Sequence, residues 1–531
     1  MPATPNVMII MADQQRADFT AGTGFGLDTM PFCDELAASG TSFRGAYTPM
    51  PACVPARTSL LSGRYPSAHR VRQNSNNRKE FRGADLFDVY AGAGYQTWFA
   101  GKPHVYRGPD DYDRWSGPYF HTSAPERAEQ DRAEQDRAFA EWLVSIDHGP
   151  ATGPTPFPVE VQYPARIVDD TLAQYAERDR DRPWLSWVSF PEPHNPYQVP
   201  EPYFSLFDPA DVPDRVAGPE AASAKGGPYR WLREVIEAKR PGYDDLWRRY
   251  RASYCGMLRL IDDQVRRLVS TIEAETPGET IYLYLADHGD FVGEYGLQRK
   301  GAGLPEALVR IPFFAAGPGI RSGERSDALI SLVDVLPTLA EVIGAEIPEG
   351  VQGRSLWPLL TGADDGAGVF DSIYAEGGYG GGFYPPDARP ELHFPYRGTV
   401  YDELNTVTQS GTSAMLRRGD WKLIFHSDGR GELYCLADDP AELDDRWDDP
   451  VCAGRRQELT TELLRWRLEV ADDLPTGAYR PLRAEHNWYR RAAHPERHSS
   501  TPRPGKHPEA PRPEPVEGQA EEALRPAQGT P

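Results

Sequence analysis

Five short apolar runs, each followed by loop-forming residues, are the feature that most constrains the fold of this chain. They are Val7–Ala12, Thr97–Ala100, Trp184–Phe190, Ile281–Ala286 and Ile311–Ala316. Segments with helical spacing lie between and after them: Met30–Ser39, Asp85–Ala93, Tyr250–Ile272 and Leu332–Ile343. This alternation predicts an α/β fold with a large, mostly parallel central sheet flanked by helices.

Two carboxylates directly follow predicted strands. Asp13 comes after Val7–Ala12, and Asp287 comes after Ile281–Ala286. Because active residues of parallel sheets gather at the carboxyl ends of strands, we expect both side chains at one edge of the sheet. Each alone is also typical of a helix cap, but the two together favour a metal site.

The chain is predicted to hold a catalytic domain, residues 1–375, and a smaller α+β domain, residues 376–485. The glycine-rich segment Gly377–Gly382 lies at the boundary. The smaller domain has two β signals and one helix signal, at Trp421–Phe425, Leu433–Leu436 and Arg456–Val470. Residues 486–531 are rich in Pro, Glu, Arg and Gly, which predicts a disordered tail.

Residues 107–165 are predicted to be an insertion, because they are rich in Pro, Gly and charge. They contain a short tandem repeat, Arg127–Asp131 followed by Arg132–Asp136. We interpret this repeat as a solvated helix that has no catalytic role.

The formal net charge of −22 disfavours nucleic acid and anionic lipid as partners. Val7–Ala12 is too short to span a membrane and lacks the flanks of a signal peptide, so a cytoplasmic location is the expectation. The five cysteines are odd in number and widely spaced, which makes a disulfide framework or a structural zinc site improbable.

One segment carries a specific motif, Cys53-Val54-Pro55-Ala56-Arg57, followed by Thr58-Ser59-Leu60-Leu61-Ser62-Gly63-Arg64. Further segments follow a fixed order around it. They are Asp13-Gln14, Gly101-Lys102-Pro103-His104, Ser189-Phe190 with Pro193-His194, Ala286-Asp287-His288-Gly289-Asp290, Lys300, Arg418-Gly419-Asp420-Trp421-Lys422-Leu423 and Glu432-Leu433-Tyr434. With these segments in order, the sequence resembles the sulfatase family of the alkaline phosphatase superfamily over roughly residues 5–470, insertion excluded.

This resemblance implies that Cys53 is oxidised to formylglycine (3-oxoalanine) by a formylglycine-generating enzyme. The aldehyde would hydrate to a diol, of which one hydroxyl attacks sulfur and the other later expels sulfate. The implied activity is hydrolysis of a small-molecule sulfate monoester to an alcohol and sulfate.

The resemblance also implies one divalent metal ion, held by Asp13, Gln14, Cys53, Asp287 and His288. Hard oxygen ligands suit Ca²⁺ or Mg²⁺. The family more commonly has Asp at position 14 and often Asn at position 288. Gln14 and His288 therefore leave Mn²⁺ open, and they also resemble the phosphonate and phosphodiester hydrolases of the superfamily.

By the same resemblance, cationic and acid–base groups surround the diol. Arg57 lies one helical turn after Cys53, so it can face the diol. Lys102 and Lys300 match sulfate-binding lysines, and His104 matches the base of the elimination step. His194 or Lys300 would protonate the leaving alcohol, and Asn74 is a candidate sulfate contact together with Lys102, His194 and Lys300.

Two other functions stay open. The same machinery could act on a phosphonate monoester or phosphodiester, although Lys102 and His104 favour sulfate. An unmodified, inactive chain could instead bind an anion, but it would not need the whole set of acid, base and metal residues. The sequence predicts neither the substrate alcohol (sugar, choline or aryl) nor the oligomeric state.

Overall fold

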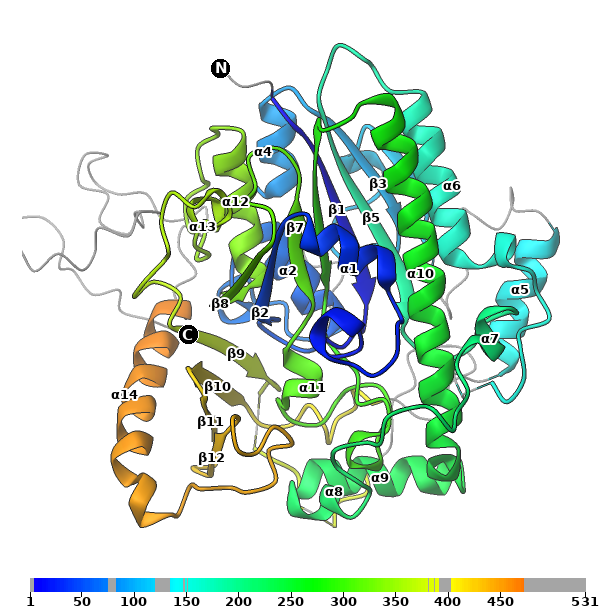
Figure 1. Cartoon of the computed structure of the whole chain (residues 1–531). Coiled ribbons are helices and arrows are strands. Elements are labelled where there is room, and N and C mark those ends of the chain that lie inside the picture. The colour runs from blue at the N-terminus through cyan, green and yellow to red at the C-terminus, as the bar shows by residue number, and fades with distance from the viewer. Residues whose placement is uncertain are drawn as a thin grey trace, which may run out of the picture. The chain divides into compact units, whose positions relative to one another are not determined.

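A computed structural model describes residues 4–74, 83–119, 134–146, 149, 151–380, 382–385, 387–390 and 403–471. These residues form an eight-stranded sheet in the order β4-β3-β5-β1-β6-β7-β2-β8 (Figure 1). The strands are β1 (Asn6–Asp13), β2 (Thr41–Tyr47), β3 (Gln96–Gly101), β4 (Arg114–Ser116), β5 (Trp184–Pro193), β6 (Thr280–Ala286), β7 (Phe313–Ala316) and β8 (Glu324–Ser331). Of these, β7 pairs antiparallel with both neighbours and the other pairs are parallel. The predicted fold class is thus confirmed.

Four of the five predicted apolar runs lie within strands, and the run 311–316 overlaps β7 from Phe313 onwards. The strands β2, β4 and β8 are missing from the prediction. The edge strand β8 explains why. Its first residues, Glu324–Asp327, alternate between partly buried and exposed, so its sequence lacks a continuous apolar run. β2 is interrupted by Arg44 and Gly45 for a similar reason.

Helices cover both faces of the sheet (Figure 1). The central strand β1 shows how the two cores are divided. Met8, Ile10 and Ala12 pack on one side with α1 (Pro31–Ala38), α6 (Tyr163–Ala176) and α10 (Trp247–Glu275). Val7, Ile9 and Met11 pack on the other side with α2 (Cys53–Ser62), α4 (Leu86–Gly92) and α12 (Val335–Val342). Successive side chains of a strand point to opposite faces, so a strand buried on both faces is apolar throughout.

A separate four-stranded antiparallel sheet follows, in the order β12-β11-β10-β9. Its elements are β9 (Ser372–Gly377), β10 (Ser413–Arg418), β11 (Trp421–His426), β12 (Gly431–Cys435) and the helix α14 (Ala453–Val470). The predicted signals at Trp421, Leu433 and Arg456 correspond to β11, β12 and α14. The division into two domains at residue 375 stays a prediction.

Further helices complete the described part of the chain. The α-helices are α3 (Pro66–His69), α5 (Glu134–Ser145), α7 (Tyr203–Leu206), α8 (Ala221–Ala224), α9 (Gly227–Lys239), α11 (Glu306–Val309) and α13 (Trp357–Thr361). The 3₁₀ helices are η1 (Ala21–Thr23), η3 (Pro109–Asp111), η4 (Val159–Val161), η5 (Tyr243–Leu246), η6 (Glu294–Gly296), η7 (Leu332–Asp334) and η8 (Pro450–Cys452). Among the described residues, no helix is both long and apolar enough to cross a membrane.

The predicted insertion contributes to the core. Most of the tandem repeat lies outside the described residues, as does the predicted tail 486–531. The helix α5 begins at the end of the repeat and buries Phe139 and Leu143 against the core that contains α6. The strand β4 extends the large sheet beside β3. The segment 107–165 is therefore packed onto the sheet at these points.

Candidate active site

Several of the predicted site residues lie at or just after the ends of four neighbouring strands, at one edge of the large sheet. Asp13 ends β1 and Asp287 follows β6, while Lys102 follows β3 and His194 follows β5. These strands are adjacent in the order β3-β5-β1-β6 and run parallel. Parallel pairing therefore brings their carboxyl ends together, as the positions of the two aspartates predict.

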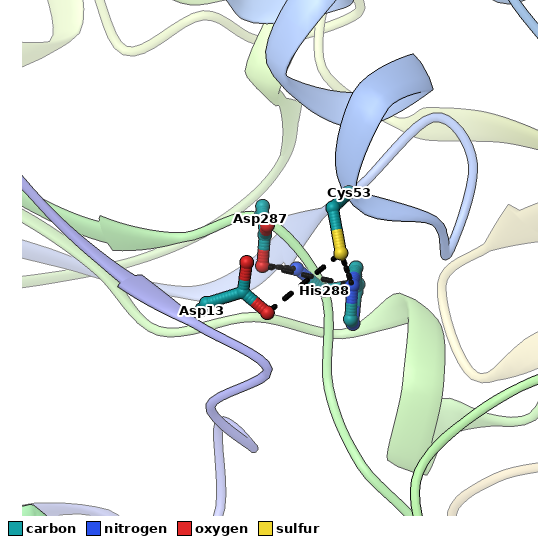
Figure 2. Close-up of side chains that lie close together, drawn as sticks. All are labelled: Asp13, Cys53, Asp287 and His288. Atoms are coloured by element: carbon teal, nitrogen blue, oxygen red, sulfur yellow. Dashed lines mark hydrogen bonds and ion pairs between the residues drawn. The ribbon is translucent and has the colours of Figure 1, made fainter. Parts of the chain in front are cut away.

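Four buried side chains converge at this edge: Asp13, Cys53, Asp287 and His288 (Figure 2). One ligand atom from each lies within 4.8 Å of the others. The Sγ atom of Cys53 is 3.3 Å from Nε2 of His288 and 3.7 Å from Oδ1 of Asp13. Two carboxylates, an imidazole and the side chain at position 53 form a donor set that fits a divalent metal ion.

The guanidinium of Arg57 joins the two carboxylates. Its Nε donates to Oδ2 of Asp287 and one terminal nitrogen donates to Oδ2 of Asp13, both at 2.9 Å. The other terminal nitrogen donates to the carbonyl of Lys102 and to Oγ of Ser189, both at 2.7 Å. Arg57 is fully buried. It faces the carboxylates, so it orients them.

The charge around Asp13 favours its ionised form. Lys102 Nζ lies 2.7 Å from Oδ2 of Asp13, the oxygen that Arg57 also contacts. Burial alone would raise the pKa of Asp13, but Lys102 and Arg57 outweigh it and hold that pKa well below its usual range. The carboxylate therefore stays charged although it is fully buried.

His288 presents one ring nitrogen to the cluster. Its Nδ1 lies 2.9 Å from the carbonyl oxygen of Gly289, which accepts a hydrogen bond from a protonated Nδ1. Burial lowers the pKa of His288. A neutral ring with its proton on Nδ1 has its Nε2 lone pair directed at Cys53, the arrangement that a metal-ligating histidine needs.

Cys53 is the first residue of α2 and is 1% exposed. Lys102 Nζ and Asn74 Nδ2 each lie 4.0 Å from its Sγ, and Asn74 Oδ1 accepts from the amide of Val54 at 3.1 Å. Burial and the charge of Asp13 raise the pKa of the thiol to about 11. The unmodified side chain is thus protonated at neutral pH and is a poor nucleophile.

Gln14 lies beside the cluster, and both the oxygen and the nitrogen of its side-chain amide form hydrogen bonds. Its Oε1 accepts from Lys300 Nζ at 2.7 Å, and its Nε2 donates to Asp290. Lys300 Nζ is also 3.2 Å from Nε2 of His194 and 3.6 Å from Oε1 of Glu403. The second lone pair of Gln14 Oε1 stays compatible with a metal, but the residue also positions the Lys300–His194 pair.

His104 follows Lys102 with a backbone φ of +40°. Burial and the nearby cations Lys102 and Arg57 hold the pKa of His104 well below its usual range. The imidazole is therefore neutral at neutral pH, which is the state that accepts a proton.

Sequence reasoning missed three residues of this site. Asp290 accepts from Tyr197 Oη at 2.7 Å and from Gln14, and Ser189 accepts from Arg57. Asp290 and Ser189 lie within the motif segments given above, so the sequence did contain a signal for these two residues. Glu403 contacts Lys300 from the segment between β9 and β10, 103 positions away, and no local pattern marks it.

A protein-family model described as Sulfatase matches residues 5–345. The chain belongs to the sulfatase family. As a member of that family it is an enzyme, and the general reaction of the family is hydrolysis of sulfuric esters. The motif segments that resemble this family lie together at the site described above.

Three curated relatives are similar to this sulfatase over most of their own length. An arylsulfatase of Clostridium perfringens is 27% identical over 385 residues, covering 67% of this chain and 78% of the relative. A multifunctional alkaline phosphatase superfamily protein of Trinickia caryophylli is 26% identical, covering 88% and 96%. A choline-sulfatase of Rhizobium meliloti is 26% identical, covering 88% of each chain.

Solved structures share the fold of this sulfatase. The phosphonate monoester hydrolase of Agrobacterium radiobacter aligns with a TM-score of 0.72 at 22% identity, covering 91% of this chain and 98% of that one. A 2-O GAG sulfatase aligns with a TM-score of 0.64 at 19% identity, covering 88% and 93%. At these identities the likeness establishes the fold alone.

Proposed function

We propose that this sulfatase hydrolyses a sulfate monoester through a formylglycine made from Cys53. The observation that supports it best is the position of Cys53, at the start of α2 and beside Asp13, Lys102 and His288. The thiol stands where an oxygen of the hydrated aldehyde would lie. The oxidation requires a formylglycine-generating enzyme, which we propose as the maturation partner.

Asp13, Asp287, His288 and residue 53 would hold one divalent ion, with Gln14 Oε1 as a further ligand. Ca²⁺ is our first choice, with Mg²⁺ and Mn²⁺ as alternatives, because every proposed donor except the His288 nitrogen would be an oxygen. When bound, the ion would supply a positive charge that makes a hydroxyl of residue 53 more acidic.

In the first step, a hydroxyl of the diol loses its proton to water, its oxygen attacks sulfur, and the bond from sulfur to the alcohol oxygen breaks. Lys102 and Lys300 would hold the sulfate oxygens, with Asn74 as an additional contact. Lys300 and His194 lie 3.2 Å apart, so either can pass a proton to the departing alcohol oxygen. The product is a sulfate ester on residue 53.

In the second step, His104 would remove the proton from the remaining hydroxyl of residue 53. The electron pair forms the C=O bond of the aldehyde, and the C–O bond to sulfate breaks. Water then restores the diol. The lowered pKa of His104 keeps the imidazole neutral, which is the state that can accept this proton.

The test is the mass of the peptide that contains residue 53, with and without co-expression of a formylglycine-generating enzyme. We expect the thiol to be replaced by the aldehyde, and the activity on sulfate esters to rise in proportion to the converted fraction. Full activity from a preparation that holds only free thiol would overturn the proposal. Absence of conversion, metal and activity together would favour the inactive anion-binding alternative.

Phosphonate monoester or phosphodiester hydrolysis is the second candidate. Gln14 and His288 favour it, because they depart from the commonest sulfatase ligand set. We expect higher kcat/KM on an aryl sulfate than on an aryl phosphonate or phosphodiester with the same leaving group, because Lys102 and His104 suit a sulfate ester. The reverse order would reassign the substrate.

A further inference from the structure

Asp290 lies beside the proposed metal ligands, and the proposed mechanism gives it no role. It is fully buried and stands two positions after His288. Its Oδ1 accepts from the backbone amides of Val292 and Arg299, both at 2.8 Å. Its Oδ2 accepts from Nε2 of Gln14. One oxygen of the carboxylate therefore holds the loop after β6, and the other contacts the residue that follows β1.

The backbone of Gln14 is fixed independently of its side chain. Its φ is +70°, a value that residues other than glycine seldom adopt. Its amide N–H donates to Oδ1 of Asp287 at 3.0 Å, and its carbonyl accepts from Tyr254 Oη at 2.9 Å. Such a conformation persists only where the surroundings enforce it, and it is found mainly at functional sites. The side-chain torsions of Gln14 are then the part that other contacts must set.

The side-chain amide of Gln14 can be turned in two ways, because its oxygen and nitrogen are similar in size and opposite in hydrogen-bonding character. Two neighbours distinguish them. Lys300 Nζ, which only donates, lies 2.7 Å from Oε1. The carboxylate of Asp290 accepts from Nε2, and Tyr197 Oη donates to the same carboxylate oxygen at 2.7 Å. The observed orientation is the one that satisfies both neighbours.

The reverse orientation of this amide would be unfavourable at both ends. Its nitrogen would face the ammonium of Lys300 and the proposed metal ion, and its oxygen would face the carboxylate of Asp290. All three side chains are buried, so water would not replace the lost hydrogen bonds. The contact with Asp290 therefore decides which atom of Gln14 is directed at the cluster.

We propose that Asp290 is the positioning residue of Gln14: by accepting from Nε2, it keeps Oε1 directed at Lys300 and at the proposed metal ion. This inference rests on the metal site of the proposed function. A carboxylate at position 14 would need no such support, because both of its terminal atoms are oxygens. The need for Asp290 should therefore depend on an amide at position 14.

Asp290→Asn tests the proposal, because it changes polarity and almost no volume. The new amide can keep its oxygen on Val292 and Arg299, and its nitrogen then faces Nε2 of Gln14. Two donors cannot pair, so the amide of Gln14 should turn over. We expect the affinity for Mn²⁺ and Ca²⁺ to fall by about 10- to 100-fold. Isothermal titration of the metal-free full chain, co-expressed with a formylglycine-generating enzyme, measures this change.

The double variant Gln14→Glu/Asp290→Asn separates positioning from a purely structural role. The carboxylate at position 14 can accept from the new amide on one side and from Lys300 on the other, so most of the lost metal affinity should return. Gln14→Glu alone places two carboxylates against each other. It should lower the urea midpoint of unfolding in EDTA, and adding Asp290→Asn should raise that midpoint again.

Asp262→Asn is the matched control. Asp262 is also fully buried and accepts from two backbone amides, those of Phe32 and Cys33 in α1, so we expect its substitution to leave the metal affinity unchanged. Circular dichroism identifies variants that fail to fold. If Asp290→Asn is one of them, the urea midpoints of Gln14→Glu and of the double variant still decide the proposal.

The inference is overturned if the parent chain binds metal and Asp290→Asn binds it equally well. It is also overturned if Asp290→Asn does not raise the urea midpoint of Gln14→Glu. A parent chain that binds neither ion would instead reject the metal site of the proposed function. The urea comparison is made without metal, so it would then still accept or reject the orienting contact between Asp290 and Gln14.

Discussion

At the scale of single residues, Arg57 and His104 act on different parts of the site. Arg57 donates to Asp13 and Asp287 from one planar group, so it fixes the distance between two proposed metal ligands. His104 is kept neutral by burial and by nearby cations. The first residue should therefore affect metal binding and the second a single step of turnover.

Arg57→Lys should weaken divalent-metal binding by about 10- to 100-fold, because an ammonium group cannot hold both carboxylates in a fork. Isothermal titration with Ca²⁺ and Mn²⁺ measures the change. Arg251→Lys is the matched control, since Arg251 is buried and pairs with Glu294 but contacts neither aspartate. Unchanged metal affinity in Arg57→Lys would show that Arg57 does not position the ligands.

His104→Ala should release about one equivalent of alcohol per active site and then stall, because the second hydroxyl keeps its proton. A sulfated residue 53 should accumulate and be visible by mass. The measurement is a rapid-mixing assay with a chromogenic aryl sulfate. His194→Ala should slow the first step without a burst. A slowed burst in His104→Ala, without sulfated enzyme, would instead assign His104 to sulfate binding.

At the scale of elements, the approach of β3 to β5 sets the position of Lys102. Gly101 ends β3 with a φ of +124°, and a Cβ there would meet the carbonyl oxygen of Ser189 at 1.9 Å. The amide of Lys102 donates to that same carbonyl at 2.9 Å. Glycine is thus needed for both the backbone conformation and the space.

Gly101→Ala should destabilise the protein by about 2–4 kcal/mol, since a clash with backbone adds to the backbone strain. It should also raise KM for the sulfate ester, because Lys102 shifts. Gly94→Ala is the matched control: its φ is +86° but nothing lies within 4 Å of the added Cβ, so we expect a loss of about 1 kcal/mol. Urea unfolding and steady-state kinetics measure both. Equal losses in the two variants would contradict the close approach.

At the scale of the whole molecule, a buried ion-pair cluster connects β11 of the small sheet to α11, whose Glu306 also accepts a hydrogen bond from Tyr47 of β2 in the large sheet. Lys422 of β11 lies 3.0 Å from Glu306 of α11 and 2.8 Å from Glu442. Burial alone would raise the pKa of Glu306, but Lys422 and Arg417 outweigh it and lower that pKa to about 2. Ionised Glu306 therefore stabilises the folded chain.

This cluster predicts acid sensitivity with a defined sign. Because the folded pKa of Glu306 is depressed, its contribution is complete above the unfolded pKa of about 4.3 and disappears as the pH falls towards 2. Glu306→Gln should lower the free energy of unfolding at neutral pH. Between about pH 4.5 and 2.5, the free energy of unfolding should then fall less in this variant than in the parent chain. Urea unfolding at several pH values measures this. The exposed Glu341→Gln should leave the profile unchanged, and a parent-like slope in Glu306→Gln would contradict the prediction.

The sequence by itself determined the α/β class and the two strand-end aspartates, because strand periodicity and strand ends are local properties. It also marked Cys53, Lys102 and His104 through their motif segments. Tertiary structure decided the rest. The edge strand β8 lacks an apolar run, Arg57 faces the carboxylates, and the amide of Gln14 connects Lys300 with Asp290. Glu403 reaches Lys300 from a distant segment. Such contacts depend on which strands become neighbours, and no periodicity within one segment encodes that.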